Sequence, residues 1–245
     1  MEDHSEFFGP AEKALRQSWE AHRQAFGPIL EPAFQENPQV RLILIAALNH
    51  ISRREIKQGM DLLKQISEHC VYDEDKAAWT FFVGLCFEMA GAKKQMLKWY
   101  ADAGKYHHHF YLPYLKLAKA AHEASQLDTA REYYMTAIEC LLEMKEQDRD
   151  PVILGSAYSN LTSCLTMQHR YQEAEAVWQQ ARQYPQQPGA SATAAILYAA
   201  MGDVKRSEEY LTALKRQAPA AAAQIQNTVR QILNGTHPEF REKTT

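Results

Sequence analysis

Residues 171–181 read YQEAEAVWQQA, and the pair Trp178 and Ala181 in this stretch belongs to a pattern that recurs along the chain. The equivalent pairs are Tyr100 and Ala103, Tyr134 and Ala137, and Leu211 and Leu214. The first members of successive pairs recur at intervals of 34, 44 and 33 along the chain. An internal period of about 34 residues is typical of stacked helical hairpins, in which each unit buries its apolar face against its neighbours. The sequence therefore predicts an α-solenoid.

The composition agrees with a repetitive helical chain. Its 245 residues exceed the usual length of one compact core, but a solenoid grows by adding units and needs no central core. The net charge is only −3, so attraction to nucleic acid or to anionic membranes is not implied. The longest aliphatic run, residues 42–48, is much shorter than the roughly 20 residues of a membrane span. We expect neither a nucleic-acid partner nor a membrane partner.

The N-terminal stretch MEDHSEFFGPAEKAL, residues 1–15, has no basic region followed by an apolar one. It does not resemble a secretion signal, and we expect a cytoplasmic protein. The four cysteines, Cys70, Cys86, Cys140 and Cys164, are scattered singly without CxxC spacing. We therefore expect reduced cysteines that pack between helices, and no metal or redox site.

Amphipathic helical segments run through almost the whole sequence, and no convincing alternating strand occurs, which predicts an all-α fold. Gly91, Gly202 and the stretches 126–129 and 168–170 are expected to divide hairpins into their two helices. Asp150 before Pro151 predicts a helix start. Thr129 and Glu132 have capping-box spacing, which predicts a second start.

These patterns resemble the tetratricopeptide repeat, a helical hairpin of about 34 residues. The family has small residues at positions 8 and 20, a bulky residue at 11, an aromatic or Leu at 24 and Ala at 27. We let the units begin at residues 77, 111, 155 and 188. Position 8 then holds Gly84, Ala118, Thr162 and Ala195, and position 20 holds Met96, Ala130, Ala174 and Ser207. Small residues there let the two helices approach, while bulky residues at 11 and 24 fill the space between hairpins.

A weaker unit begins near residue 40, with Ala47, Gly59 and Leu63 at positions 8, 20 and 24. The resemblance thus implies a right-handed α-solenoid of about four to five antiparallel helix pairs. We expect N-terminal capping helices over residues 1–39, repeats over 40–221, and a C-terminal capping helix and tail over 222–245. A last helix over 219–233 is expected to place Ala221, Ile225, Val229 and Ile232 on one face.

Motifs for catalysis or metal binding are missing from the sequence. Residues 107–109 are three adjacent histidines, which point in different directions on a helix and make a poor metal site. His122 and Glu123 would open an HExxH motif, but Gln126 stands where the second histidine belongs. No GxSxG, P-loop or dinucleotide fingerprint occurs. We expect no enzyme activity, no metal and no cofactor.

In the tetratricopeptide family the first helix of each unit lines an inner groove through positions 2, 5, 6, 9, 12 and 13. The positions that the resemblance assigns to partner binding hold Phe81, Phe82, Leu85, Lys116, Lys119, His122, Asn160 and Ser163. Exposed together, Phe81 and Phe82 would anchor a partner. The alternative is that the N-terminal helices fold back and cover them.

Asn160 stands at position 6, where chaperone-binding members of the family hold a peptide backbone or a terminal carboxylate. Those members carry basic residues at positions 2 and 6 of the next unit, where this chain has Gly189 and Thr193. A complete carboxylate clamp is therefore not expected. Lys116 and Lys119 would have to supply any contact with an anion.

We expect a non-catalytic scaffold that binds a peptide or helix segment of another protein in the groove. One alternative is a sensor of a small signalling peptide, similar to the peptide-pheromone receptors of Gram-positive bacteria. Those receptors have an N-terminal DNA-binding or effector bundle, for which residues 1–37 are too short. The other alternative is a structural subunit, a homo-oligomer that associates through the region of Phe81 and Phe82.

Overall fold

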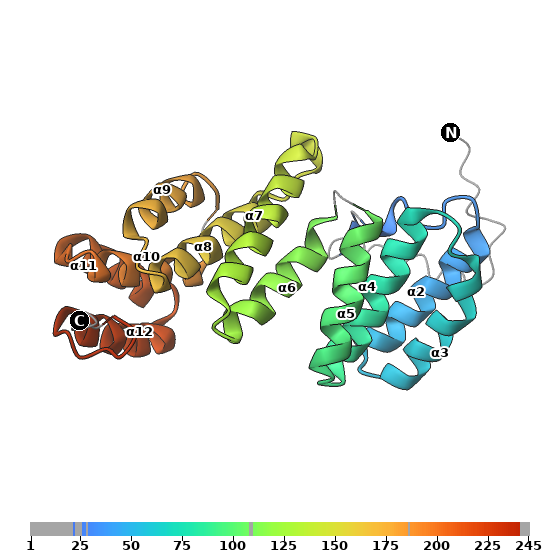
Figure 1. Cartoon of the computed structure of the whole chain (residues 1–245), viewed down its shortest axis with the longest axis horizontal. Coiled ribbons are helices and arrows are strands. Elements are labelled where there is room, and N and C mark those ends of the chain that lie inside the picture. The colour runs from blue at the N-terminus through green and yellow to red at the C-terminus, as the bar shows by residue number, and fades with distance from the viewer. Residues whose placement is uncertain (1–21, 23–25, 28, 108–109, 186, 241–245) are drawn as a thin grey trace. The chain divides into compact units, whose positions relative to one another are not determined.

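The computed structural model describes residues 22, 26, 27, 29–107, 110–185 and 187–240, and within these ranges all regular secondary structure is helical (Figure 1). The all-α prediction is confirmed. The longer helices are α2 (Pro38–Ser52), α3 (Ile56–Ile66), α4 (Asp73–Met89), α5 (Lys93–Tyr106), α6 (Tyr111–Glu123), α7 (Leu127–Glu143), α8 (Pro151–Met167), α9 (Tyr171–Ala181), α10 (Pro188–Ala200), α11 (Val204–Gln217) and α12 (Pro219–Leu233). Two single 3₁₀ turns, η2 (Ser67–His69) and η3 (Glu146–Asp148), lie in connections.

The chain divides into two compact units, Met1–Pro113 and Tyr114–Thr245. In the first unit α2 packs on α3, α3 on α4 and α4 on α5. In the second unit α7 packs on α8, α8 on α9 and α10, and α10 on α11 and α12. The sequence did not indicate this division. The predicted repeat region, residues 40–221, includes helices of both units, and its continuity as one domain stays a prediction.

The five hairpins share one turn. The residue at position 15 of each unit has a positive φ, and the N–H that follows it donates to the carbonyl of position 11. The five bonds are Glu55 to His50, Ala92 to Phe87, Gln126 to Ala121, Arg170 to Leu165, and Asp203 to Tyr198, at 2.8–3.0 Å. This is the Schellman arrangement that ends a helix. Its constant place in each unit confirms the predicted register, including the weaker unit at residue 40.

The signature residues form the core of the hairpins. In the units that begin at residues 77, 111, 155 and 188, every residue at positions 8, 20, 24 and 27 is buried. Gly84 shows why position 8 is small: a Cβ there would lie 2.8 Å from the ring of Tyr100. Such a contact would push the two helices of the hairpin apart.

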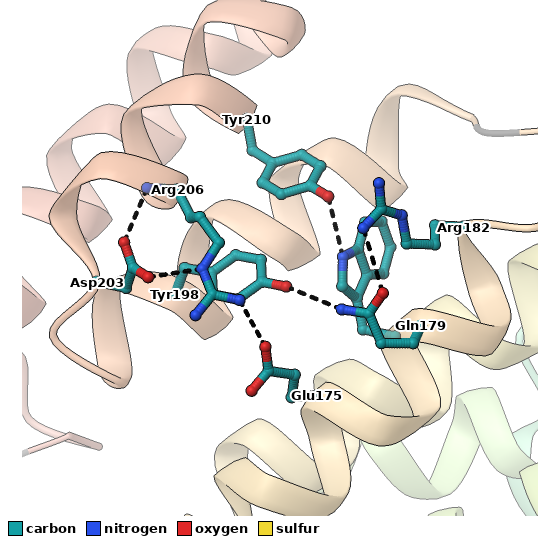
Figure 2. A network of polar contacts seen from close by, with 8 residues as sticks. Glu175, Gln179, Arg182, Tyr198, Asp203, Arg206 and Tyr210 are labelled. Carbon is teal, nitrogen blue, oxygen red and sulfur yellow. Dashed lines mark hydrogen bonds and ion pairs between the residues drawn. The ribbon is translucent and has the colours of Figure 1, made fainter.

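A polar and aromatic network joins the last two full hairpins (Figure 2). Arg206 on α11 bonds Glu175 on α9 at 2.6 Å and Asp203 at 2.6 Å, and its guanidinium lies 4.2 Å from the ring centre of Tyr198. The ring of Tyr198 also stacks on that of Tyr210, with the ring centres 5.7 Å apart. The network fixes α9 of one unit against α10 and α11 of the next.

The helices on either side of the insertion, α7 and α8, are both 17 residues long. Asp150 accepts from the N–H groups of Val152 and Ile153, so the predicted helix start is confirmed. Arg149 donates to carbonyls at the end of α7, including that of Leu141 at 2.8 Å. The capping box at Thr129 is wrong: α7 begins at Leu127, because the shared turn already ends at Gln126.

Helix α12 packs on α10 and α11, as a capping helix should. Val229 and Ile232 are buried as expected, but Ala222 rather than Ala221 faces the core. The shared turn recurs after it, with Gly235 at φ 65° and the N–H of Thr236 bonded to the carbonyl of Gln231. Helix α12 therefore stands in the place of another unit's first helix. In the described parts of the chain, no helix is long and apolar enough to cross a membrane.

Candidate partner-binding face

Phe81 and Phe82 lie in the core of the first unit, and both are 0% exposed. The ring of Phe26 meets both of them edge-on, at 5.3 Å from Phe82 and 6.1 Å from Phe81. The expectation of an exposed phenylalanine anchor is therefore wrong, and the alternative, in which N-terminal residues cover the pair, holds. Self-association through these two side chains is not available in this conformation. Leu85, one turn further along α4, is half-buried.

A buried carboxylate holds the N-terminal segment on α4. Asp75 is 3% exposed and accepts hydrogen bonds from the backbone N–H of Phe34 at 2.6 Å and of Tyr72 at 3.3 Å. A charged acceptor on two backbone donors is among the stronger hydrogen-bonded arrangements. The cover over Phe81 and Phe82 is thus fastened to the helix that carries them.

The second unit contains a pocket of about 230 Å³ between α8 and α10, which we call the hydroxyl pocket. It is lined by Gly155, Ser156, Ser159, Asn160, Pro185, Gln187, Gly189, Ala190 and Thr193. Ser156, Asn160 and Thr193 occupy groove positions 2, 6 and 6 of their units. Among these lining residues none is charged, so the pocket offers hydroxyl and amide groups only.

The hydroxyl of Ser159, a lining residue of the hydroxyl pocket, makes no hydrogen bond to the described residues. The residue is 5% exposed, and its Oγ has no hydrogen-bond partner among the described residues. Other buried hydroxyls on the same helix are satisfied: Thr162 donates to the carbonyl of Tyr158 at 2.9 Å, and Thr166 to that of Thr162 at 2.8 Å. An unpaired buried hydroxyl costs about 1–3 kcal/mol, so a group that enters this hollow and bonds the Oγ would recover that cost.

Gly155 shapes one wall of the hydroxyl pocket. A Cβ at this position would lie 2.9 Å from the Cβ of Tyr184 and 3.3 Å from the carbonyl oxygen of Pro185. The glycine therefore lets the connection between α9 and α10 approach α8. The ring of Tyr158 stacks on that of Tyr184 at 5.9 Å and holds this connection in place.

The remaining predicted groove residues do not line the hydroxyl pocket. Lys116 is half-buried on α6, and Lys119 is exposed with a long ion pair of 3.9 Å to Glu123. Ser163 on α8 is half-buried. His122 is half-buried as well, and its Nε2 lies 3.2 Å from the sulfur of Met167 on α8. The expected juxtaposition of the lysines with Asn160 stays a prediction.

Two further hollows have a different character. One of about 370 Å³ lies between α11 and α12, where the stack of hairpins ends, and includes the half-exposed Leu233. Another, of about 270 Å³, lies beside Asp75 and the exposed Val71 and Tyr72 in the first unit. Neither lining contains an unsatisfied buried polar side-chain atom, in the part of the chain that is described.

Potential metal ligands are dispersed over the part of the chain that the structure describes. Within the described ranges, no group of three or more His, Cys, Asp or Glu side chains could hold a metal ion. His108 and His109 of the histidine run lie outside the described residues, so the expectation for that run stays a prediction. Among the described residues no cysteine is joined in a disulfide, and Cys86, Cys140 and Cys164 are buried as expected.

Comparison with solved structures identifies the fold. PilF from Pseudomonas aeruginosa superimposes with a TM-score of 0.62 at 13% identity, over 90% of this chain and 99% of that one. BtubC from P. vanneervenii superimposes with a TM-score of 0.62 at 14% identity, over 97% of this chain and 98% of that one. The chain has a tetratricopeptide-repeat-like fold. MamA from AMB-1 is similar to this repeat protein at a TM-score of 0.53 and 14% identity, over 78% and 98%. No family model and no curated protein matches the sequence.

Proposed function

We propose that this chain is a non-catalytic scaffold that binds an extended segment of another protein on the face formed by the first helices of its second unit. The observation that carries this proposal is the buried, unpaired Oγ of Ser159 in a pocket beside Asn160 and Thr193. A peptide backbone carries one N–H donor and one C=O acceptor per residue, and an uncharged set of hydroxyls and amides is complementary to it.

The size of the hydroxyl pocket also favours a chain segment over a free small molecule. Pockets that enclose small ligands span about 300–1,000 Å³. At about 230 Å³ the hydroxyl pocket takes one or two residues of a longer segment. The rest of that segment would lie along the face, where Lys116, Lys119 and Ser163 are our further proposed contacts. Leu85 lies in the first unit, next to Phe81 and Phe82. Because both rings are buried, they cannot anchor a partner beside it, and we do not include Leu85 among the proposed contacts.

Comparative capture from an extract of the native host tests this function. Wild type, Asn160→Ala and Thr193→Val would be immobilised in parallel, and bound proteins quantified by mass spectrometry. Asn227→Ala is the matched control, because Asn227 is exposed on α12, outside the pocket. We expect a partner that wild type and the control retain and that both pocket variants lose. A set of bound proteins that is the same for all four chains would contradict the proposed face.

The lysines are tested on the same partner. The double variant Lys116→Ala, Lys119→Ala should weaken binding at low salt and flatten its salt dependence, because exposed charge contacts are screened by ions. An unchanged salt dependence would remove the lysines from the proposed site without affecting the hydroxyl pocket. The proposal includes a cytoplasmic location, which fractionation of host cells would check.

A further inference from the structure

The chain turns back on itself after α12. Residues 236–240 follow the C-terminal turn of that helix, and the half-buried side chain of Phe240 packs against a core cluster from three helices. The cluster consists of Ala195, Ala199, Leu211, Val229 and Ile232. Phe240 is thus the one large apolar side chain of an otherwise polar C-terminal stretch, residues 234–245. Its ring packs on the second unit, and we call residues 236–240 the tail.

Two histidines hold the docked ring. Phe240 meets the ring of His169 edge-on at 5.9 Å, and the ring of His237 at 5.2 Å. The backbone of the segment forms a turn, in which the N–H of Phe240 donates to the carbonyl of His237 at 3.2 Å. Because His169 belongs to the shared turn after α8, the tail contacts the unit that begins at residue 155, which is distant from it in the sequence.

The acidic neighbour of Phe240 acts on a third histidine. Burial lowers the pKa of His122, and the carboxylates of Glu123 and Glu239 oppose that shift. The carboxylate of Glu239, which directly precedes Phe240, therefore favours the charged form of His122. His122 is the penultimate residue of α6, His169 follows the end of α8, and Ala199 is the penultimate residue of α10. The segment thus lies beside the C-terminal ends of α8 and α10, and the charge of Glu239 acts on a residue near the end of α6.

This docking surface, which we call the tail site, shares two helices with the hydroxyl pocket. The pocket is lined by the first halves of α8 and α10, whereas the tail site involves their last turns. Asn160 and His169 are nine positions apart, or roughly 13 Å at about 1.5 Å per helical residue. An extended segment of about four residues spans that distance.

We propose that residues 236–240 are an internal ligand of the tail site, and that this site accepts from a partner an aromatic side chain that directly follows an acidic residue. The assignment of the site to a partner rests on the proposed function. Its chemistry is that of the Glu239–Phe240 pair: a ring between His169 and the apolar cluster, and a carboxylate toward His122. A partner segment of this kind would displace the tail and extend toward the hydroxyl pocket.

The strength of this competition can be bounded. A short tether holds its segment at an effective concentration on the order of millimolar. A tail that binds in trans with a Kd of about 0.1 mM would then be docked about nine-tenths of the time, and would weaken a competing segment about tenfold.

A titration with the tail's own sequence tests the proposal. The receptor is a chain that ends after Thr236, since Thr236 supplies the hydrogen bonds that close the turn after α12. The probe is a synthetic peptide of residues 234–240 with an amidated C-terminus. We expect NMR shifts at His169, Ala199 and Ala200 with a Kd at or below about 0.1 mM, and at least tenfold weaker binding of the Phe240→Ala peptide. The normal peptide should bind the full chain about tenfold more weakly than it binds the shortened one.

A second receptor guards against a folding defect in the shortened chain. The full-length variant Phe240→Ala keeps every residue of the tail except its anchor and should bind the normal peptide as the shortened chain does. Absence of shifts at His169 and Ala200 in both receptors, or equal affinity of wild type and shortened chain, would overturn the proposal. Asn160→Asp should leave this titration unchanged, so failure of the hydroxyl pocket and failure of the tail site give different results.

Discussion

The indole N–H of Trp178 donates a hydrogen bond of 3.1 Å to the hydroxyl of Tyr210, and the two rings meet edge to face at 5.4 Å. Trp178 lies on α9 and Tyr210 on α11, so this contact joins the second helices of consecutive hairpins. Trp178 is also one of the largest fully buried side chains in the described structure, at 1% exposed. Stability of a stacked repeat resides largely in such contacts between units.

Trp178→Ala should lower the free energy of unfolding by about 3–5 kcal/mol, because it removes a large buried side chain and leaves a cavity between hairpins. Tyr210→Phe is the matched control, since it removes only the hydrogen bond and should cost about 0.5–1.5 kcal/mol. Urea unfolding followed by circular dichroism measures both. A loss below roughly 1 kcal/mol for Trp178→Ala would show that the residue does not join the hairpins.

Phe82→Ala should destabilise the first unit by about 3–5 kcal/mol, because Phe82 is fully buried against Phe26 and Phe81. Thermal unfolding measures the effect. The wild-type melting temperature combined with a weaker affinity for a partner would restore Phe82 as an exposed anchor and contradict the structure.

Ser159→Ala separates binding from stability. Removal of an unpaired buried hydroxyl should leave the free energy of unfolding unchanged or raise it by up to about 1 kcal/mol, while affinity for the partner falls. Thr162→Ala, the control, removes a hydroxyl that already bonds the carbonyl of Tyr158 and should not gain stability. A clear loss of stability in Ser159→Ala would mean that the hydroxyl serves the fold rather than a ligand.

The buried thiols should be unreactive. Burial raises the pKa of Cys86, Cys140 and Cys164 to about 11, from an ordinary value near 9. At pH 8 about one thiol in a thousand is then ionised, and the thiolate is the reactive form. Their contribution to stability is complete below pH 9 and is lost as the pH rises through about 11. We expect slow reaction with a chromogenic disulfide reagent at pH 8 and a fast one in denaturant. A fast reaction of two or more thiols in the native chain would contradict this burial.

The sequence carried the repeat register because small and bulky residues alternate at fixed places, as Gly84 and Tyr100 illustrate. Only some of the turn residues could be predicted from the sequence. Gly91 and Gly202 are visible signals, whereas Ser125 and His169 adopt the same positive φ at a cost of about 1–2 kcal/mol that the rest of the turn absorbs.

The candidate site depended on contacts that a repeat pattern does not contain. Position rules placed Phe81 and Phe82 on the groove, but Phe26, outside the repeats, covers them. Asn160 was assigned by position, yet the pocket around it also needs Gly155, whose missing Cβ admits the loop before α10. Phe240 had one signal in the sequence, an isolated phenylalanine in a polar tail, and its docking on His169 is a long-range contact.

The calorimetric affinity of one captured partner segment for wild type and Asn160→Asp tests the proposed face most directly. The substitution replaces an amide that can donate by a carboxylate that cannot, and it puts a charge in an uncharged pocket. Asn227→Asp makes the same change in charge on the exposed surface of α12. We predict at least tenfold weaker binding, about 1.4 kcal/mol, for Asn160→Asp and unchanged binding for Asn227→Asp. Equal affinity of all three chains would contradict the claim that the hydroxyl pocket binds the partner.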